Sequence, residues 1–384
     1  MIDTIESSRF GKRLTIGDEF NRGGHGLIWK TNDPRLLLKQ FEPSLISDDP
    51  GQQDILRRKA QRAYTAFSAA WKGNQPELRA LPGEYLTYRG NPSYLMQKVD
   101  GQLLQTLFRQ NAILSETKVA LSYAVARAMR KLHDAKIVHA DANPENLLVA
   151  QSITGFTVVV LDIDAGGLSS KSCVGPVYPM GQPKRLYKAP ELAAMGWADL
   201  FKRSLFFAPD EYALSVLLYQ LLVDYQGPFC SVRTHPNPAV TNYRPFEPTA
   251  YRDPGVSWPM PWQERLLARS MLSPKVASLF YETFQDRFSL HRRPTASQWE
   301  EALCPTPAPP PVRHVYAIAN ASISVTRASP RPLTDPIAVP QKPDAILHAG
   351  QEAFGWREAM AGIVRKLHLK RGVSGNEGGL TNAA

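Results

Sequence analysis

The stretch His139-Ala140-Asp141 is followed by Pro144-Glu145-Asn146-Leu147-Leu148-Val149, and sixteen residues after Asn146 comes Asp162. The residues before Asp162 are apolar, as they would be at the end of a strand. The chain therefore holds a carboxylate, an amide five residues later and a second carboxylate close together. Phosphoryl transfer from ATP with magnesium needs such a set, because one Asp accepts the hydroxyl proton of the acceptor while the Asn and the other Asp hold metal ions.

This arrangement resembles the catalytic core of the protein kinase-like superfamily, in which the same parts are written H-R-D-x-x-x-x-N and D-F-G. The resemblance implies ATP and Mg2+ as cofactors, Asp141 as the base or orienting carboxylate, and Asn146 and Asp162 as metal ligands. Ala140 replaces an Arg that pairs with a phosphorylated activation loop in many kinases, so we do not expect activation by that route. Asn143 replaces a Lys that steadies the transferred phosphate, and an Asn would donate a hydrogen bond without a charge.

A glycine turn is predicted within residues 20–29, Phe-Asn-Arg-Gly-Gly-His-Gly-Leu-Ile-Trp. Backbone N–H groups in such a turn can approach phosphate oxygens, because no Cβ is in the way. The family pattern is G-x-G-x-x-G-x-V, and its first glycine is replaced here by Asn21, so the match is partial and a plain turn is the alternative. The predicted nucleotide contacts of this segment are Gly23, Gly24, Gly26 and Ile28.

The segment Leu36–Phe41 predicts a strand with a single lysine among apolar residues. By the resemblance, Lys39 contacts the α- and β-phosphates, whereas a solvated edge lysine is the alternative. In active protein kinases a Glu on the next helix pairs with this lysine, but residues 52–72 contain no Glu. We infer either a different tether for Lys39 or reduced activity.

The segment Tyr94–Gly101 resembles the last strand of the small lobe and the hinge that follows it. Met96 would lie at the back of the adenine pocket, although plain core packing would also explain it. Gln97 and Val99 would offer backbone groups to the edge of the adenine. These three residues complete the predicted nucleotide site.

Further landmarks follow in the family's order. Asp162-Ile163-Asp164 stands in the D-F-G place, where Ile163 would fill the apolar slot. Asp164 replaces the glycine and is either a further metal ligand or a cap of the following turn, of which we favour the cap. Ala189-Pro190-Glu191 matches A-P-E, and Asp210 opens a long apolar helix from which it would brace the catalytic-loop backbone. Arg293 of a late R-P-T is expected to pair with Glu191.

Composition favours a globular protein with a basic surface. The 384 residues are 43% hydrophobic and carry a net charge of +10, but no block of consecutive Lys or Arg marks a nucleic-acid arm. The three cysteines stand far apart, which indicates neither a disulfide framework nor a zinc site. We expect a cytoplasmic protein with no transmembrane segment, because no apolar run is long enough to span a bilayer.

These patterns predict an α+β, two-lobed protein kinase-like fold over residues 1–303, with a small β-rich lobe at about 10–99 and a larger helical lobe at about 100–303. Residues 304–343 hold 10 of the 32 prolines, which indicates an extended linker. Residues 344–384 form a tail with a candidate amphipathic helix, which would dock on the main domain or on a partner.

The expected function is ATP-dependent phosphorylation of a protein Ser or Thr, because A-P-E and R-P-T are landmarks of protein kinases. The family resemblance leaves two alternatives open: a nucleotide-binding pseudokinase that acts as a scaffold, and a small-molecule kinase of the same superfamily. A nucleic-acid-binding module is a weaker alternative, since only the net charge suggests it.

Overall fold

The computed structural model describes residues 3–71, 75–110, 112–152, 155–169, 176–179, 183–223, 225, 227–228, 266, 272–285 and 290–304. Its contacts divide the chain into two units, Met1–Pro307 and Ala308–Ala384, and every described residue belongs to the first. The predicted linker, apart from Cys304, and the predicted tail therefore lie outside the described residues.

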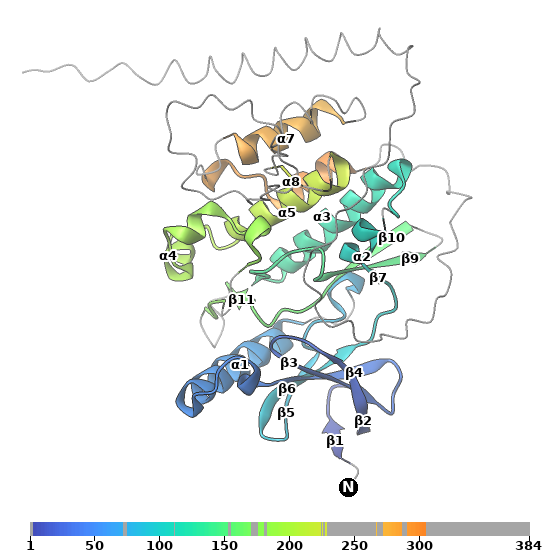
Figure 1. Ribbon diagram of the computed structural model, residues 1–384, viewed down its shortest axis with the longest axis vertical. Helices are drawn as coiled ribbons and strands as arrows, with labels where there is room; N and C mark the ends of the chain where they lie inside the picture. Colours follow the sequence, from blue (N-terminus) through green and yellow to red (C-terminus); the bar gives the residue numbers. More distant parts are fainter. Residues whose placement is uncertain are drawn as a thin grey trace, which may run out of the picture. The chain divides into compact units, whose positions relative to one another are not determined.

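The small lobe is built on a six-stranded antiparallel sheet, in agreement with the β-rich small lobe expected from the sequence (Figure 1). The strand order is β1-β2-β3-β4-β6-β5. The strands are β1 (Thr4–Ser7), β2 (Lys12–Arg22), β3 (Gly26–Thr31), β4 (Leu36–Phe41), β5 (Glu84–Tyr88) and β6 (Asn91–Gln97). Because β4 lies between β3 and β6, all six of its residues are buried, including Lys39.

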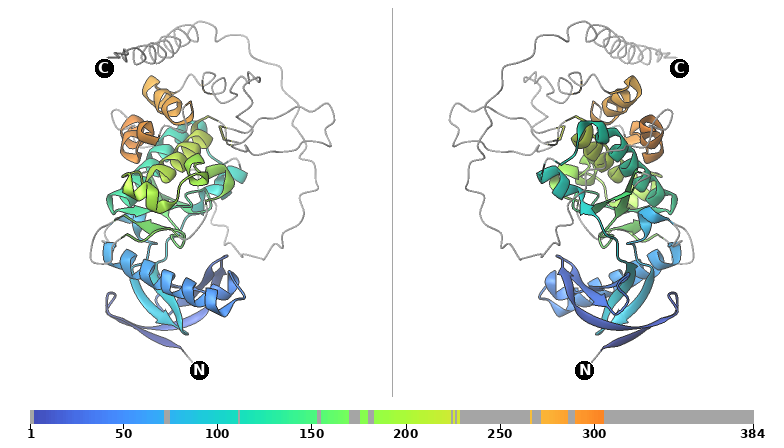
Figure 2. Two further views of the ribbon diagram at one scale, coloured as in Figure 1. Left: turned by 90° about the vertical axis from the view of Figure 1, so that its left-hand side faces the viewer. Right: turned by 90° about the vertical axis from the view of Figure 1, so that its right-hand side faces the viewer.

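Helix α1 (Pro50–Ala70) packs against this sheet at β5 and β6 (Figure 2). The carboxylate of Asp49 caps its first turn by accepting a hydrogen bond from the Gly51 amide at 2.9 Å, and Pro50 occupies the first turn, where no backbone donor is lost. Ala60, Ala63, Tyr64 and Phe67 are buried at the spacing of one helix face. Of these four residues, only Tyr64 carries a polar group.

The large lobe is mainly helical, as expected (Figure 1). Its α-helices are α2 (Leu104–Arg109), α3 (Lys118–Asp134), α4 (Trp197–Lys202), α5 (Ala208–Leu222), α7 (Pro274–Phe284) and α8 (Ala296–Leu303). Short 3-10 turns at Pro43–Leu45, Pro76–Leu78, Ser115–Thr117, Arg185–Tyr187, Pro190–Ala193 and Leu290–Arg292 join the elements of both lobes. Within the described residues, no helix is both long and apolar enough to cross a membrane.

The core of the large lobe lies between α3, α5, α7 and α8. Trp299 of α8 is fully buried, its ring centroid lies 4.8 Å from that of Phe280, and its indole N–H donates to the Ser215 hydroxyl at 3.2 Å. A capping box of Thr295 and Gln298 opens α8 and satisfies backbone N–H groups that the helix leaves unpaired. These contacts hold the later helices against α5, whose first turn reaches the catalytic loop.

Two small antiparallel sheets complete the large lobe. One has the order β10-β9-β7 and consists of β7 (Gln102–Leu103), β9 (Leu147–Ser152) and β10 (Gly155–Val160). The other pairs β8 (Ile137–Val138) with β11 (Gly167–Leu168). The loops between these strands carry the residues that the sequence singles out.

Candidate active site

Strand pairing brings the two predicted catalytic loops side by side. Residues 139–146 connect β8 to β9, and residues 161–166 connect β10 to β11. Because β9 pairs with β10 and β8 with β11, both ends of the two loops are held together. The Leu161 amide also donates to the Asn146 carbonyl at 2.9 Å, and a His139 ring nitrogen lies 3.0 Å from the Leu161 carbonyl. The segment between Asn146 and Asp162 is therefore the β9–β10 hairpin, which brings the two residues close together.

Asp210 fixes the start of the catalytic loop, as predicted. Its carboxylate, 1% exposed, accepts hydrogen bonds from the His139 amide at 2.6 Å and the Ala140 amide at 2.9 Å. Ala140 has a φ of +67°, a left-handed conformation that costs an L-residue roughly 1–2 kcal/mol. The two charge-assisted hydrogen bonds offset that strain, so the first turn of α5 sets the backbone on which Asp141 stands.

Asp141 and Asn146 are in direct contact. The Asn146 side-chain N–H donates to the Asp141 carbonyl at 2.9 Å and lies 3.3 Å from its carboxylate. This orientation directs the amide nitrogen toward Asp141, so the amide oxygen is the group left for a metal ion. Asn143 is fully buried, donates to the Asp141 carbonyl at 2.8 Å and accepts from the Glu145 amide at 3.0 Å. Both ends of its amide are thus occupied, and Asn143 shapes the loop in this conformation rather than facing an acceptor.

Lys39 lies between two carboxylates of the loop that contains Asp162-Ile163-Asp164, called the D-I-D loop below. Its Nζ is 2.7 Å from an oxygen of Asp162 and 2.7 Å from an oxygen of Asp164. Burial alone would lower the pKa of Lys39, but the two carboxylates raise this pKa well above its usual value, so the side chain stays charged. The lysine is not a solvated edge residue, since its side chain is only 8% exposed. The carboxylates that hold Lys39 in place therefore come from the D-I-D loop.

The two carboxylates differ sharply in their surroundings. The Asp162 side chain is 46% exposed and its backbone is left-handed at φ +50°, whereas the Asp164 side chain is 1% exposed. Asp164 also accepts a hydrogen bond from the Tyr64 hydroxyl of α1 at 2.8 Å. The prediction that Asp164 caps the following turn was therefore wrong: its oxygens face Lys39 and Tyr64. The sequence offered no pairing signal, because 100 residues separate Asp164 from Tyr64.

The same environment shifts the pKa values of the two carboxyl groups in opposite directions. Desolvation by the surrounding protein works against ionisation of both, although Asp162 is half exposed, and the ammonium of Lys39 lowers the pKa of Asp162 below its usual range. Burial raises the pKa of Asp164 despite the attraction of Lys39, and the nearby charge of Asp162 adds to this rise. Asp162 is thus the carboxylate more readily available, as an anion, to an incoming cation.

The glycine turn lies between β2 and β3 and is closed by a hydrogen bond from the Gly23 amide to the Gly26 carbonyl at 2.9 Å. Gly23 and Gly24 are exposed, whereas Gly26 is buried against β4, where a Cβ would collide with the Gln40 carbonyl. Gly26 is therefore required by packing, and the exposed pair is the part that can approach a phosphate. Ile28 stands opposite Lys39 in the β3–β4 register, so the turn leads directly to the lysine.

The predicted hinge keeps some of its expected backbone groups available. Met96 is 9% exposed and lies opposite Leu37 of β4. The Gln97 amide donates to the Arg79 carbonyl at 3.2 Å, so that N–H is occupied. The Val99 side chain packs beside a buried cluster that includes Leu148, and no described residue accepts a hydrogen bond from the Val99 amide. Val99 is accordingly the better placed of the two for binding an adenine edge.

One contact to Asp141 was not predicted. The backbone amide of Lys184 donates to an Asp141 carboxylate oxygen at 2.9 Å, and the Lys184 ammonium pairs with Glu145. Lys184 lies five residues before Ala189-Pro190-Glu191. A backbone donor leaves no signature in residue type, so the sequence could not reveal this contact. It connects the segment before A-P-E to the predicted catalytic carboxylate.

These residues fit Mg2+ bound through a nucleotide. Mg2+ is usually held by one or two carboxylate or amide oxygens of the protein together with phosphate oxygens and water. Asp162 and the oxygen of Asn146 provide that number of ligands. Within the described part of the chain, no three or more His, Cys, Asp or Glu side chains gather as a self-sufficient metal site. Phosphate oxygens are thus the natural remaining ligands.

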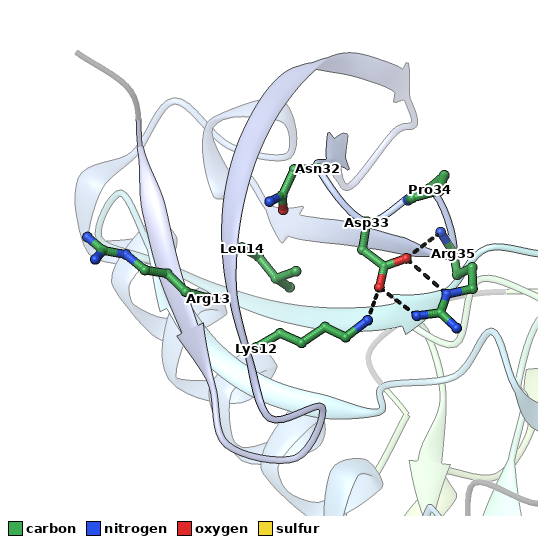
Figure 3. A pocket seen from close by; sticks show the side chains of 7 residues that line it. All are labelled: Lys12, Arg13, Leu14, Asn32, Asp33, Pro34 and Arg35. Atoms are coloured by element: carbon green, nitrogen blue, oxygen red, sulfur yellow. Dashed lines mark hydrogen bonds and ion pairs between the residues drawn. The ribbon is translucent and has the colours of Figure 1, made fainter.

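A hollow of about 450 Å³ lies elsewhere, at the start of β2 and the turn before β4 (Figure 3). Its centre is Asp33, which accepts hydrogen bonds from the Arg35 backbone and guanidinium and from Lys12. These cationic donors lower the pKa of Asp33 below its usual range. None of the predicted site residues lines this hollow, and three of its charged residues, Lys12, Asp33 and Arg35, are paired with one another, so we interpret it as a structural turn.

The sequence comparisons with known proteins point to kinases. The model of the lipopolysaccharide kinase (Kdo/WaaP) family matches residues 95–172, from β6 to the segment after β11. A probable serine/threonine-protein kinase of Streptomyces coelicolor is 29% identical over 227 residues, which are 56% of this chain and 31% of that protein. The serine/threonine-protein kinase PknE of Mycobacterium tuberculosis is 26% identical over 268 residues, 65% of this chain and 42% of that protein.

Other relatives widen the range. A probable inactive leucine-rich repeat receptor kinase of Oryza sativa is 25% identical over 238 residues, 57% of this chain and 19% of that protein. This chain therefore spans less than half the length of these curated relatives. Among solved structures, the PknI kinase domain of Mycobacterium tuberculosis aligns with a TM-score of 0.46 and 17% identity, covering 76% of this chain and 94% of that domain.

The identity of the chain rests on independent observations that agree. The family model and the sequence relatives are kinases, and the described residues form a β-rich small lobe and a helical large lobe. The motifs also lie on the expected elements in the expected order. The described residues have the two-lobed fold of the protein kinase-like superfamily, and the proteins that the chain matches in sequence are kinases.

Proposed function

We propose that this chain transfers the γ-phosphoryl group of Mg-ATP to a Ser or Thr hydroxyl of a protein. The observation that carries the proposal is a single connected set of side chains: Lys39 is ion-paired with Asp162, and Asp141 is hydrogen-bonded to Asn146. The backbone hydrogen bond from Leu161 to Asn146 joins the two pairs. Carboxylates, an amide and a buried cation in this order suit phosphoryl transfer.

Each residue has a role that its geometry supports. Lys39 stays cationic and would contact the α- and β-phosphates, while the Gly24 amide, in the exposed turn between β2 and β3 of the same lobe, would approach the phosphates. Bound Mg2+ would neutralise charge that builds up on the transferred group. Asp162 and the Asn146 oxygen would hold it. Asp141 would orient the acceptor hydroxyl and take its proton, since hydrogen bonds from Asn146 and Lys184 hold its carboxylate in place.

The positioning of these groups explains how the site would work. Phosphoryl transfer needs little covalent help from the protein, so its catalysis comes from orientation and from charges fixed before the reaction. Asp210 strains the backbone at Ala140 into the conformation that presents Asp141. Strand pairing then fixes Asn146 next to the D-I-D loop. The expected setting is cytoplasmic, consistent with three cysteines that show no pairing pattern.

A protein acceptor is favoured by the large lobe. The guanidinium of Arg293 pairs with the Glu191 carboxylate at 2.6 and 3.2 Å, and both side chains are buried. This pair anchors the A-P-E turn, a landmark of protein kinases, and the preceding segment reaches Asp141 through the Lys184 amide. An acceptor segment of a protein would be presented next to that carboxylate.

A second candidate is a kinase for a carbohydrate hydroxyl. One observation favours it: the lipopolysaccharide kinase family model matches residues 95–172, which include the hinge, the catalytic loop and the D-I-D loop. The catalytic residues would keep the same roles, because a sugar hydroxyl and a Ser hydroxyl make the same chemical demand on Asp141.

The two candidates differ in product, so the test identifies the product. The full chain is incubated with γ-labelled Mg-ATP and two acceptor pools, one of mixed proteins and one of lipopolysaccharide-type oligosaccharides. Label recovered as phosphoserine or phosphothreonine supports the first proposal. Label recovered only as a sugar phosphate would replace it with the second. Tight nucleotide binding without transfer to either pool would indicate a nucleotide-binding scaffold.

A further inference from the structure

We infer that Asp164 and Tyr64 together tether Lys39 while nucleotide is bound, taking the place of the helix glutamate that this chain lacks. The inference rests on the proposed function, because it assigns the partner of the lysine at that same site. It makes Tyr64 a positioning residue that acts through Asp164. It also assigns different roles to the two carboxylates of the D-I-D loop: Asp162 would hold the metal ion, and Asp164 would hold Lys39.

The division of tasks follows from exposure. Both carboxylates lie 2.7 Å from the Lys39 ammonium, but 46% of the Asp162 side chain is exposed and 1% of the Asp164 side chain is. A metal ion carrying phosphates and water can reach only the exposed group. Once an Asp162 oxygen binds a cation, its attraction for Lys39 falls. Asp164 is then the remaining carboxylate within pairing distance of Lys39 among the described residues.

Without Asp164, the ammonium would be buried with no counter-charge whenever Asp162 holds metal. A buried charge without a partner is strongly unfavourable, so the Lys39 side chain would leave the position in which it faces the nucleotide. Asp164 thus holds the lysine extended in the state that matters for transfer.

Tyr64 fixes the orientation of Asp164. Its hydroxyl donates to one Asp164 oxygen at 2.8 Å, while the other oxygen faces Lys39. Burial and the Asp164 charge raise the pKa of Tyr64 well above its usual value, so the phenol remains an O–H donor. The Tyr64 ring is fully buried and packs edge-on against Phe41 and Tyr94, with centroids 6.5 and 4.7 Å away. Helix α1 is therefore joined to Lys39 through a phenol and a carboxylate on another loop.

The test uses variants that remove one link at a time. Tyr64→Phe removes only the hydroxyl, and Asp164→Asn removes the charge but keeps the shape of the side chain. Asp164→Gly places a glycine at the third position of the motif, as in the D-F-G of the family. The matched control is Tyr88→Phe, which loses a hydroxyl that donates to Asp3 at 2.8 Å in the same lobe but away from Lys39. Calorimetry on the full chain measures the affinity for Mg-ATP and for adenosine, and steady-state assays measure kcat and KM.

We expect Asp164→Asn and Asp164→Gly to weaken Mg-ATP binding roughly ten- to hundredfold, the scale of a lost charge-assisted hydrogen bond, with adenosine affinity unchanged because adenosine carries no phosphate. Tyr64→Phe should weaken Mg-ATP binding several-fold and lower kcat, and the control should match wild type. Tyr64→Phe combined with Asp164→Asn should be no worse than Asp164→Asn alone, since Tyr64 acts through Asp164.

Several results would overturn the inference. One is wild-type Mg-ATP affinity in Asp164→Gly. Another is recovery of Asp164→Asn at high Mg2+ concentration, which would make Asp164 a metal ligand. A third is an equal loss of adenosine and Mg-ATP affinity in Tyr64→Phe, which would reduce the tyrosine to a packing role. If wild type binds Mg-ATP but phosphorylates no acceptor, the proposed function fails, while the affinity measurements still decide on the tether.

Discussion

Replacing Arg293 with alanine should remove much of the stability of the large lobe. The side chains of Arg293 and Glu191 are 1% and 2% exposed, and the two groups meet at 2.6 and 3.2 Å. The same guanidinium donates to the Ala208 carbonyl at 2.7 Å and lies 5.2 Å from the Tyr212 ring. Truncation leaves the Glu191 carboxylate buried without a counter-charge, which costs about 3–5 kcal/mol.

An exposed ion pair provides the comparison. Arg58 and Asp54 of α1 meet at 2.8 Å, almost the same distance, but their side chains are 69% and 58% exposed. Water screens that pair, so Arg58→Ala should cost no more than about 0.5 kcal/mol. The two variants remove the same guanidinium and differ mainly in the burial of what is left behind.

Urea unfolding of the full chain, followed by far-UV circular dichroism, measures both losses. A double variant, Arg293→Met with Glu191→Leu, should regain most of the stability, since removing both charges removes the desolvation penalty. A loss below about 1 kcal/mol in Arg293→Ala, or a double variant as unstable as the single one, would refute the reasoning from burial.

Four further outcomes are expected. Gly26→Ala should destabilise the small lobe in thermal melts because its Cβ collides with the backbone of β4, whereas Gly24→Ala meets open space and should leave the melting temperature unchanged. Burial raises the pKa of Glu211 from 4.5 to about 7, so the folded state binds the extra proton and stability should fall as pH rises between these values. Glu211→Gln should flatten that slope in denaturant titrations. Asp162→Ala should abolish magnesium-dependent turnover with an unchanged circular dichroism spectrum. A chain lacking residues 304–384 should unfold as cooperatively as the whole, and an unfolded truncation would make the tail part of the core.

Much of this fold follows from the sequence because its signals are local or ordered along the chain. The single lysine in an apolar strand and the apolar residues that end a strand before Asp162 are short-range patterns, and the structure has both strands. The long-range predictions that succeeded, Asp210 to the catalytic loop and Arg293 to Glu191, came from the family resemblance. Their residue types are the ones that the family uses for these contacts.

The missed contacts share a physical cause. A tyrosine on the buried face of a helix looks like core packing, so nothing marked Tyr64 as the partner of Asp164. The available signal was a combination: a helix without Glu, followed far along the chain by an extra Asp in the D-F-G place. Contacts through backbone groups, such as Lys184 to Asp141 and Gln97 to Arg79, do not depend on side-chain identity and were beyond reach.

The most direct test of the central claim compares wild type with Asp141→Asn in the transfer of label from γ-labelled Mg-ATP to protein. Asn keeps the size of the side chain, and its single amide oxygen can still accept from one of the two donors, the Lys184 amide or the Asn146 side chain, but it cannot accept the hydroxyl proton. We predict label on Ser or Thr with wild type and at least a hundredfold slower transfer with the variant, roughly the minimum contribution of a general base. Equal transfer by both proteins would contradict it.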